Sequence, residues 1–418
     1  MYRSICCAVV LTAAVQHASG QDAKLQEEVQ DLRQRVQELE KSRRPVGNAF
    51  NPDLSLILQG TAARSSQDPA NFHISGFAPA GNNAGGEVGP QRRGFSLGES
   101  ELVVASNIDP YFRGQLVAAL TPENEVEVEE AFFQTLQLGR GLTLKGGRFL
   151  SAIGYQNPIH QHAWDFQDAP LAYKAFLGGR WNDDGVQMKW VAPTDLFVEL
   201  GTELGRGRAF PATDPNSNGA GAWTLFGHLG GDIGVGTAWR AGLSYLKTSP
   251  RERAFDDAGV TQSFSGQSRL WIADFVLKWA PNGNATVTNF KLQGEYFRRN
   301  ESGSIDFNST VGDYASRQSG WYLQGVYQFM AQWRVGYRYD GLDHGSVSNG
   351  LGLTAADAPL LLTDHSPTRN TVMLDWSPSE FSRIRLQLAS DKSRAGVTDN
   401  QVLVQYLYSL GAHGAHTF

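Results

Sequence analysis

The chain is poor in cysteine and has no long apolar run in its body. Among its 418 residues the only cysteines are Cys6 and Cys7, which lie in an N-terminal apolar segment. Once that segment is removed, the chain can form neither disulfides nor a cysteine-based metal or catalytic site. No stretch of about 18 apolar residues follows the segment, which excludes a membrane-spanning helix from the rest of the chain.

Residues 1–20 have the features of a secretory signal peptide. Arg3 supplies the basic start, residues 5–15 form the apolar core, and Ala18-Ser19-Gly20 provides a small-residue cleavage site. No lipobox precedes Cys7, so we do not expect a lipoprotein. The mature protein is therefore predicted to be exported.

A coiled-coil helix is predicted over residues 21–44. Apolar residues recur there at alternating spacings of four and three, at Leu25, Val29, Leu32, Val36 and Leu39. Such a short seam is marginal as an isolated helix, so we expect it to pair with copies of itself. The alternative is a single amphipathic helix that lies on another surface. Residues 45–53 form a linker.

The rest of the chain is typical of a protein built from strands. It contains 46 glycines and 11% aromatic residues, and its last segment, 401–418, alternates in hydrophobicity. Val402, Val404, Tyr406, Tyr408 and Leu410 share one face, which is the period of a β-strand. A soluble edge strand could show this period. The segment ends on Phe418 and resembles the closing strand of Gram-negative outer-membrane β-barrels, which implies that Phe418 is part of the signal read by the barrel-assembly machinery.

Sixteen segments with strand character follow one another between residues 54 and 418. They are 54–62, 95–107, 111–120, 125–138, 142–150, 184–192, 195–204, 222–232, 237–247, 268–279, 287–299, 319–329, 333–341, 369–376, 382–391 and 401–411. The predicted fold class is all-β: a transmembrane antiparallel β-barrel of about 16 strands, with the short N-terminal coiled-coil helix in front of it.

The connections alternate between tight turns and longer loops. The longer ones are 63–94, 151–183, 205–221, 249–267, 300–318, 342–368 and 393–400, with one short exception at 121–124. Short periplasmic turns and long external loops are typical of outer-membrane barrels. This pattern places both termini in the periplasm.

Alternation also predicts which side chains face the lumen. On one such strand, Trp321 and Leu323 would face lipid while Gln324 faces inward. The predicted pore-lining charges are Arg113, Lys145, Lys189, Arg240, Lys278, Lys291, Arg334, Arg338, Arg385, Glu127, Glu129, Glu199 and Glu295. A lumen lined in this way admits water and small solutes. Alternatively, most of these charges pair across the wall and only keep the lumen wet.

The long loop 151–183 completes a resemblance to porins. Strand order, the N-terminal coiled segment, this loop and the terminal aromatic are similar to the broad porin group, and most similar to its phosphate- and polyphosphate-selective branch. Some proteins of this appearance are labelled zinc-regulated outer-membrane receptors. The resemblance implies a homotrimer in the outer membrane whose pore is narrowed by residues 151–183.

The same loop contains a candidate metal site. His160, His162, Asp165 and Asp168 form an HxHxxDxxD cluster, and mixed imidazole and carboxylate ligands suit zinc. The alternative is that the loop histidines pack and hydrogen-bond within the folded loop. We favour that alternative and predict no obligatory cofactor.

The predicted function is passive diffusion of small hydrophilic solutes or ions through an outer-membrane porin. Two alternatives are an uptake protein for a specific nutrient such as zinc or phosphate, and a structural barrel that anchors the periplasmic coiled coil. No enzymatic activity is expected, because no serine or carboxylate has a spacing that matches His228, the one histidine clearly inside a strand. The expected partners are outer-membrane lipid, the barrel-assembly machinery and small solutes, but not nucleic acid.

Overall fold

A computed structural model of the chain describes residues 52–78, 88–257 and 259–411. The predicted signal peptide, the coiled-coil helix over 21–44 and Phe418 lie outside the described residues. Among the described residues, no helix is both long enough and apolar enough to cross a membrane.

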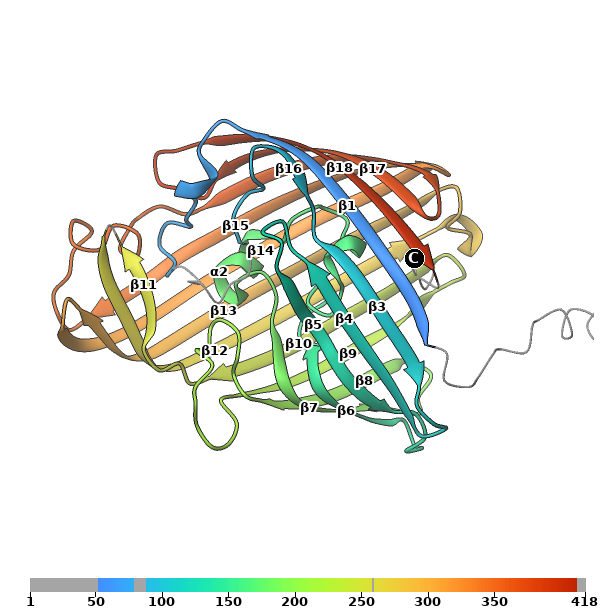
Figure 1. The fold of residues 1–418 in the computed structure, drawn as a ribbon, viewed down its shortest axis with the longest axis horizontal. Helices are drawn as coiled ribbons and strands as arrows, with labels where there is room; N and C mark the ends of the chain where they lie inside the picture. The colour runs from blue at the N-terminus through green and yellow to red at the C-terminus, as the bar shows by residue number, and fades with distance from the viewer. Residues whose placement is uncertain (1–51, 79–87, 258, 412–418) are drawn as a thin grey trace, which may run out of the picture. The chain divides into compact units, whose positions relative to one another are not determined.

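The described residues form one antiparallel sheet that closes on itself. Its strands are β1 (Asp53–Ser65), β2 (Gly94–Leu97), β3 (Ser100–Asn107), β4 (Phe112–Leu120), β5 (Val126–Thr135), β6 (Leu142–Leu150), β7 (Asn182–Val191), β8 (Phe197–Gly205), β9 (Ala222–Ile233), β10 (Thr237–Thr248), β11 (Arg253–Asp257), β12 (Val260–Trp279), β13 (Asn289–Phe307), β14 (Thr310–Met330), β15 (Trp333–Asn349), β16 (Thr368–Ser379), β17 (Ser382–Lys392) and β18 (Asp399–Gly411). β18 pairs with β1 along its length, which closes the barrel (Figure 1).

The wall of the closed barrel has sixteen strands when two short pieces are taken into account. β2 and β3 both pair with β1 and together form one interrupted wall strand, while β11 is a short hairpin partner of β12 at the rim. Each of the sixteen strand segments predicted from the sequence overlaps one of these wall strands. The predicted fold is therefore confirmed, including the antiparallel order.

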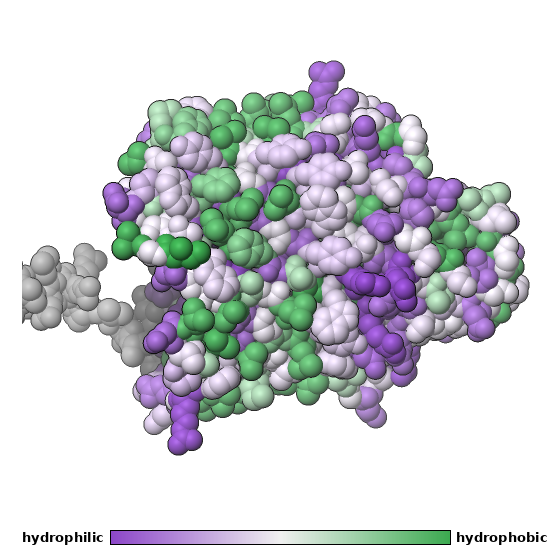
Figure 2. Space-filling model, turned by 180° about the vertical axis from the view of Figure 1, so that it is seen from behind, coloured by the Kyte–Doolittle hydropathy of each residue, from purple (hydrophilic) through white to green (hydrophobic). Residues whose placement is uncertain are grey.

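The outer surface of the barrel is apolar. On β14, Trp321 and Leu323 are 43% and 46% exposed, whereas the neighbouring Gln324 is 3% exposed. Figure 2 shows apolar and aromatic side chains spread over the wall, with a strongly hydrophilic patch toward the right-hand end of that view. A broad apolar exterior of this kind needs a nonpolar environment.

One predicted loop is wrong. Residues 300–318 are not a loop, because β13 and β14 continue through them to a two-residue turn at Asn308 and Ser309. Both turn residues have positive φ, 49° and 67°, as a tight primed hairpin turn requires. Parts of the predicted loops 249–267 and 342–368 are likewise strand, in β11, β12 and β15.

The long connection between β6 and β7 lies inside the barrel. It contains a short 3-10 helix, η3 (Gln161–Ala163), and the α-helix α2 (Leu171–Leu177), every residue of which is buried. Figure 1 shows α2 enclosed by the strands, and it contacts β13, β14 and β15. Two further 3-10 turns, η1 (Pro69–Asn71) and η4 (Pro281–Gly283), lie in other connections.

Candidate functional site

Apolar side chains hold the inward loop in the lumen. Leu171, Phe176 and Trp181 are at most 1% exposed and pack in one cluster with inward residues of β9 to β15 such as Phe297. Phe176 stacks on Phe297 with ring centroids 5.9 Å apart. The first connection, between β1 and β2, joins the same cluster through Phe77, whose ring meets Phe176 edge-on at 5.5 Å. The part of the lumen that contains this cluster is therefore filled like a protein core rather than left open.

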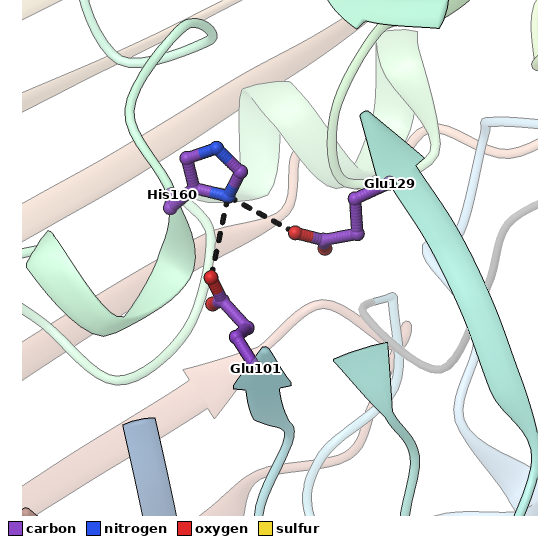
Figure 3. Close-up of side chains that lie close together, drawn as sticks. All are labelled: Glu101, Glu129 and His160. Carbon is purple, nitrogen blue, oxygen red and sulfur yellow. Dashed lines mark hydrogen bonds and ion pairs between the residues drawn. The ribbon is translucent and has the colours of Figure 1, made fainter. Parts of the chain in front are cut away.

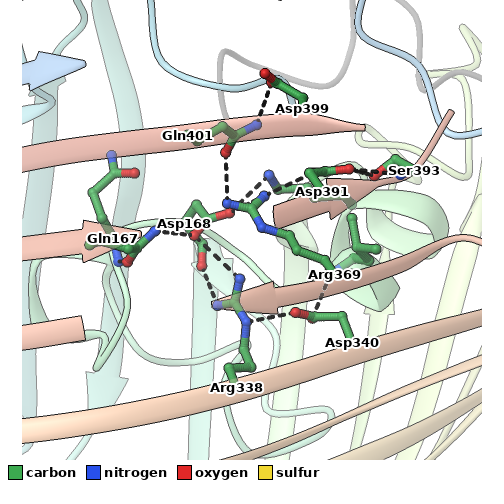
Figure 4. A network of polar contacts seen from close by, with 12 residues as sticks. Gln167, Asp168, Arg338, Asp340, Arg369, Asp391, Ser393, Asp399 and Gln401 are labelled. Carbon is green, nitrogen blue, oxygen red and sulfur yellow. Dashed lines mark hydrogen bonds and ion pairs between the residues drawn. The ribbon is translucent and has the colours of Figure 1, made fainter. Parts of the chain in front are cut away.

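Ion pairs hold the same loop to the wall. Asp168 lies between Arg369 (2.8 Å), Lys174 (3.2 Å) and Arg338 (3.3 Å), and its backbone carbonyl accepts a hydrogen bond from Arg338 (Figure 4). Burial alone would raise the pKa of Asp168, but the charges of Arg369, Lys174 and Arg338 outweigh it and hold that pKa well below its usual value.

Asp165 is a second charged anchor. Its carboxylate lies 2.9 Å from Lys291 Nζ on β13 and 3.4 Å from Arg334 Nη1 on β15. Burial opposes ionisation, yet the charges of Lys291 and Arg334 lower the pKa of Asp165 from 3.8 to about 2. The loop is therefore attached through a carboxylate that stays ionised in moderate acid.

Glu295 on β13 contacts the loop through hydrogen bonds. Glu295 accepts hydrogen bonds from the hydroxyls of Tyr173 (2.9 Å) and Tyr322 (2.7 Å). It also accepts from the backbone N–H groups of Tyr155 and Gln156 at the start of the loop. These contacts fix the loop against the middle of the β13 and β14 wall.

The histidines of the loop meet glutamates of the opposite wall. His160 Nδ1 lies 3.0 Å from Glu129 and 3.5 Å from Glu101 (Figure 3). Its Nε2 lies 3.1 Å from Glu130. His162 donates from Nδ1 to Glu101 Oε1 at 2.8 Å. Burial alone would lower the pKa of His160, but its hydrogen bonds to Glu129 and Glu130 and the charge of Glu101 raise that pKa well above 6.5.

A β-bulge brings the two consecutive glutamates to the same side. The register between β4 and β5 shifts between Val117 and Ala118, whose partners are Glu130 and Val128. Glu129 is the extra residue, so it and Glu130 both turn into the lumen, where each is buried. Bulges commonly redirect a side chain in this way.

A cavity of about 780 Å³ remains beside the loop. It lies against β5, β6 and β7 and is lined by Pro90, Gln91, Arg92, Ser96, Glu99, Thr121, Pro122, Glu123, Val126, Glu127, Val128, Glu129, Arg148, Gln161, Gly178, Arg180, Asn182, Asp184, Arg206, Arg208, Ala209 and Asp214. Most of these side chains are polar or charged. The arrangement is a closed barrel with a polar space between an inward loop and one wall.

Comparison with known proteins places the chain in a family and in a fold group. No family model matches the chain. An uncharacterized protein of Aquifex aeolicus (strain VF5) is 30% identical to it over 397 residues, which cover 88% of this chain and 80% of that protein. The chain belongs to the same family as this Aquifex protein.

Solved structures of the same architecture are outer-membrane proteins. A trimer form of Vibrio cholerae OmpT matches with a TM-score of 0.51 at 11% identity, over 86% of this chain and 99% of that one. Pseudomonas putida OprB matches at 0.52 and 12%, over 86% and 94%. An anion-selective porin from Comamonas acidovorans matches at 0.51 and 11%, over 86% and 99%. At these identities the likeness concerns the fold, and this family member has the porin fold.

The predicted metal cluster is divided in the structure of this porin-fold protein. His160 and His162 face glutamates of β3 and β5, whereas Asp165 and Asp168 are taken up by ion pairs with lysine and arginine. The four residues therefore do not form one ligand set. The alternative expectation, that the loop histidines pack and hydrogen-bond within the loop, holds in part. The rings of His160 and His162 stack on each other with centroids 5.9 Å apart, but the glutamates that they contact belong to the barrel wall.

Of the thirteen predicted pore-lining charges, only Glu127 and Glu129 line the cavity. Several others are engaged in pairs along the wall, as in Lys189 with Glu199 (3.2 Å) and Arg385 with Asp375 (2.7 Å). Arg240 pairs with Asp274, Lys145 lies over the ring of Phe132, and Arg113 and Lys278 are half-buried on β4 and β12.

The structure adds cavity residues that the sequence analysis missed. Arg148 pairs with Asp184 at 2.6 Å, and Arg180 pairs with Glu129. Arg206 and Arg208 come from the connection between β8 and β9. No sequence signal marked these residues, because whether they line the cavity depends on which part of the wall the inward loop packs against.

Proposed function

We propose that this protein is an outer-membrane porin through which small hydrophilic solutes or ions diffuse passively. The observation that carries the proposal is the polar cavity of about 780 Å³ left between the inward loop and the β5 to β7 wall of a closed barrel. A wide lumen narrowed by polar and charged groups favours passage of hydrated solutes. The proposal assigns the protein no enzymatic step.

The charges of the cavity favour weak selectivity. Its lining contains five arginines and six carboxylates, and Arg148 and Arg206 are paired with Asp184 (2.6 Å) and Asp214 (2.5 Å). A phosphate-selective channel would need an excess of unpaired cations along the passage. We therefore propose a general channel rather than a member of the phosphate-selective branch.

Location and assembly follow from the same features. The apolar exterior suits a bilayer, and the predicted signal peptide and terminal Phe418 suit export and insertion into the outer membrane. The start of β1 pairs with the end of β18 and with the end of β3, which leads into the short turn to β4, and this placement supports a periplasmic N-terminus. We also propose a homotrimer, since the comparable OmpT structure is described as a trimer form.

Single-channel recording tests the proposal. The purified, folded protein is added to planar bilayers, and we expect discrete ohmic steps with a small reversal potential in a salt gradient. Stable bilayers without current steps would reject the porin. A large reversal potential with the sign of an anion-selective channel, reduced by added phosphate, would instead favour the phosphate-selective alternative. Crosslinking of the protein in membranes tests the trimer separately.

A further inference from the structure

Three side chains meet where the inward loop touches the β3 to β5 wall. Ligand atoms of Glu101, Glu129 and His160 all lie within 4.8 Å of one another. His160 Nδ1 lies 3.0 Å from Glu129 Oε2 and 3.5 Å from Glu101 Oε2. Ligand atoms around a tetrahedral zinc ion with bonds of about 2.0–2.2 Å are themselves about 3.3–3.6 Å apart. The two distances therefore match the spacing of metal ligands with little movement.

Each of the three side chains is held by a further polar partner. The other nitrogen of His160, Nε2, lies 3.1 Å from Glu130, whose own carboxylate accepts a hydrogen bond from the backbone N–H of Leu150. Glu101 Oε1 accepts a hydrogen bond from His162, and Glu129 Oε1 accepts one from Arg180. A histidine that binds a metal through one ring nitrogen usually donates a hydrogen bond from the other nitrogen to a group such as a carboxylate.

One carboxylate oxygen of the group lacks a hydrogen bond. Glu101 is 1% exposed, and its Oε2 accepts no hydrogen bond in the structure although it points toward His160 Nδ1 at 3.5 Å. A buried carboxylate oxygen without a hydrogen bond is costly unless a nearby charge compensates it, and here the imidazole of His160 at 3.5 Å supplies that charge when it is protonated. A metal ion bound between Nδ1 and Oε2 would take the place of the imidazole proton and compensate the same oxygen.

The group can be reached from the cavity. Glu129 lines the cavity directly, and so does Gln161, which lies between the two loop histidines in the sequence. The three side chains therefore border the polar space beside the loop through Glu129. One coordination position would remain for water, facing the cavity.

We propose that Glu101, Glu129 and His160 bind a first-row divalent metal ion that fastens the inward loop to the barrel wall. The loop contributes the imidazole, while β3 and β5 contribute the two carboxylates. Glu130 and His162 act as positioning residues that orient these ligands. The inference does not depend on channel activity, because the site is defined by the folded barrel alone.

Zinc is the ion that suits the ligand set best. One imidazole and two carboxylates fit Zn²⁺ and its first-row neighbours, whereas Mg²⁺ and Ca²⁺ prefer oxygen ligands throughout. Three protein ligands with one open position are a common zinc arrangement. Co²⁺ serves as a spectroscopic substitute, since its visible absorption reports on ligand number and type.

Calorimetry of the chelator-treated, refolded protein in detergent tests the proposal. We expect one Zn²⁺ per chain, and a visible Co²⁺ spectrum that Zn²⁺ abolishes. Glu101→Gln keeps the shape of the side chain and His160→Gln keeps a polar side chain of similar length, and each change removes a ligand. Each should weaken zinc binding by more than the roughly 10- to 100-fold typical of substitutions around metal ligands. Heat-modifiable migration confirms that each variant is folded.

Two controls separate this site from other histidines. His365→Ala removes a histidine that contacts the carbonyl of Lys392, away from the group. His413→Ala with His416→Ala removes two histidines near the C-terminus. Both controls should bind zinc like the unmodified protein. Absence of zinc binding in the folded protein would overturn the proposal, as would binding that survives His160→Gln and Glu101→Gln or that disappears with His413 and His416.

Protease protection provides a second readout. If the ion fastens the loop, Zn²⁺ should slow cleavage within residues 151–181 of the unmodified protein several-fold. The same ion should have no effect on the His160→Gln variant. Equal protection of both proteins would show that zinc acts elsewhere and would contradict the proposed site.

Discussion

Arg369 Nη1 lies 2.8 Å from Asp168 Oδ2 and thereby joins the inward loop to β16. Arg338 and Lys174 surround the same carboxylate, and all four side chains are largely shielded from solvent. Breaking a buried pair on one side costs about 3–5 kcal/mol, because the remaining charges lose their partner. In a lumen that contains water, this figure is an upper bound.

Asp168→Asn should therefore loosen the loop without unfolding the barrel. The apolar anchors Phe176 and Trp181 remain, and burying such a side chain contributes about 1.5–3 kcal/mol. We expect faster proteolysis within residues 151–181 and a lower temperature of heat modification. Asp364→Asn, at an exposed loop position, is the matched control and should change neither measurement. An Asp168→Asn protein as resistant as the control would show that the ion pairs do not hold the loop.

Acid should release the second anchor. The pKa of Asp165 is lowered from 3.8 to about 2, so its ionised form stabilises the folded state above pH 3.8, and this contribution is lost as the pH falls toward about 2. The charges that act on Asp165 come from the side chains of Lys291, Arg334 and Arg385. The loop should hence stay in place from neutral pH to about pH 4 and loosen below it.

A spin label reports this transition. The mature chain is expected to lack cysteine, so Ala163→Cys gives one labelling position on the loop. Label mobility should rise between about pH 4 and pH 2. Lys291→Met removes the ammonium group that lies 2.9 Å from the Asp165 carboxylate. The pKa of Asp165 should then be higher, and label mobility should begin to rise at a higher pH. An unchanged midpoint in Lys291→Met would mean that another group controls release.

Deletion of residues 158–172 should enlarge the channel. This segment contains Asp165 and Asp168 and crosses the lumen between the two walls that it contacts. Its removal opens the lumen beside the existing cavity, so single-channel conductance should increase and larger neutral solutes should enter. Heat-modifiable migration verifies that the shortened barrel is folded. A folded deletion protein with the original conductance would place the narrowest section elsewhere.

The barrel was predictable because lipid favours apolar residues on the outer face of each strand, so the sequence of a strand alternates between apolar and polar residues. The predicted strands carry apolar residues at many of their outward positions, as β14 does at Trp321 and Leu323. The extensions of β13 and β14 carry polar outward residues instead, such as Ser302, Asp313 and Arg317, which are exposed. Without an apolar exterior the alternation disappears, so residues 300–318 gave no strand signal.

The site was less predictable because its contacts are distant in sequence. Strict alternation would turn Glu129 and Glu130 to opposite faces, and only the bulge in β5 brings both to His160. Asp165 and Asp168 looked like ligands beside the histidines, but the arginines that pair with them lie on β15 and β16. The spacing of residues in the loop could not reveal these partners.

The charge of the cavity should set the sign of the weak selectivity. Glu127 lies on β5, is exposed and lines the cavity, so its carboxylate acts on passing ions through water. At 4 Å in water a unit charge contributes about 1 kcal/mol, and salt reduces that further. Glu127→Lys reverses the charge and should shift the permeability ratio a few-fold toward anions, with little change in conductance.

Reversal potentials in a salt gradient measure this shift. Glu380→Lys makes the same change at an exposed position in the tight turn between β16 and β17, away from the cavity lining, and should leave the potential unaltered. Added salt should reduce the effect of Glu127→Lys, because the charge acts through solvent. If both variants shifted the potential equally, the ions would respond to the net charge of the protein and not to the cavity. If neither did, the conducting path would pass elsewhere in the lumen.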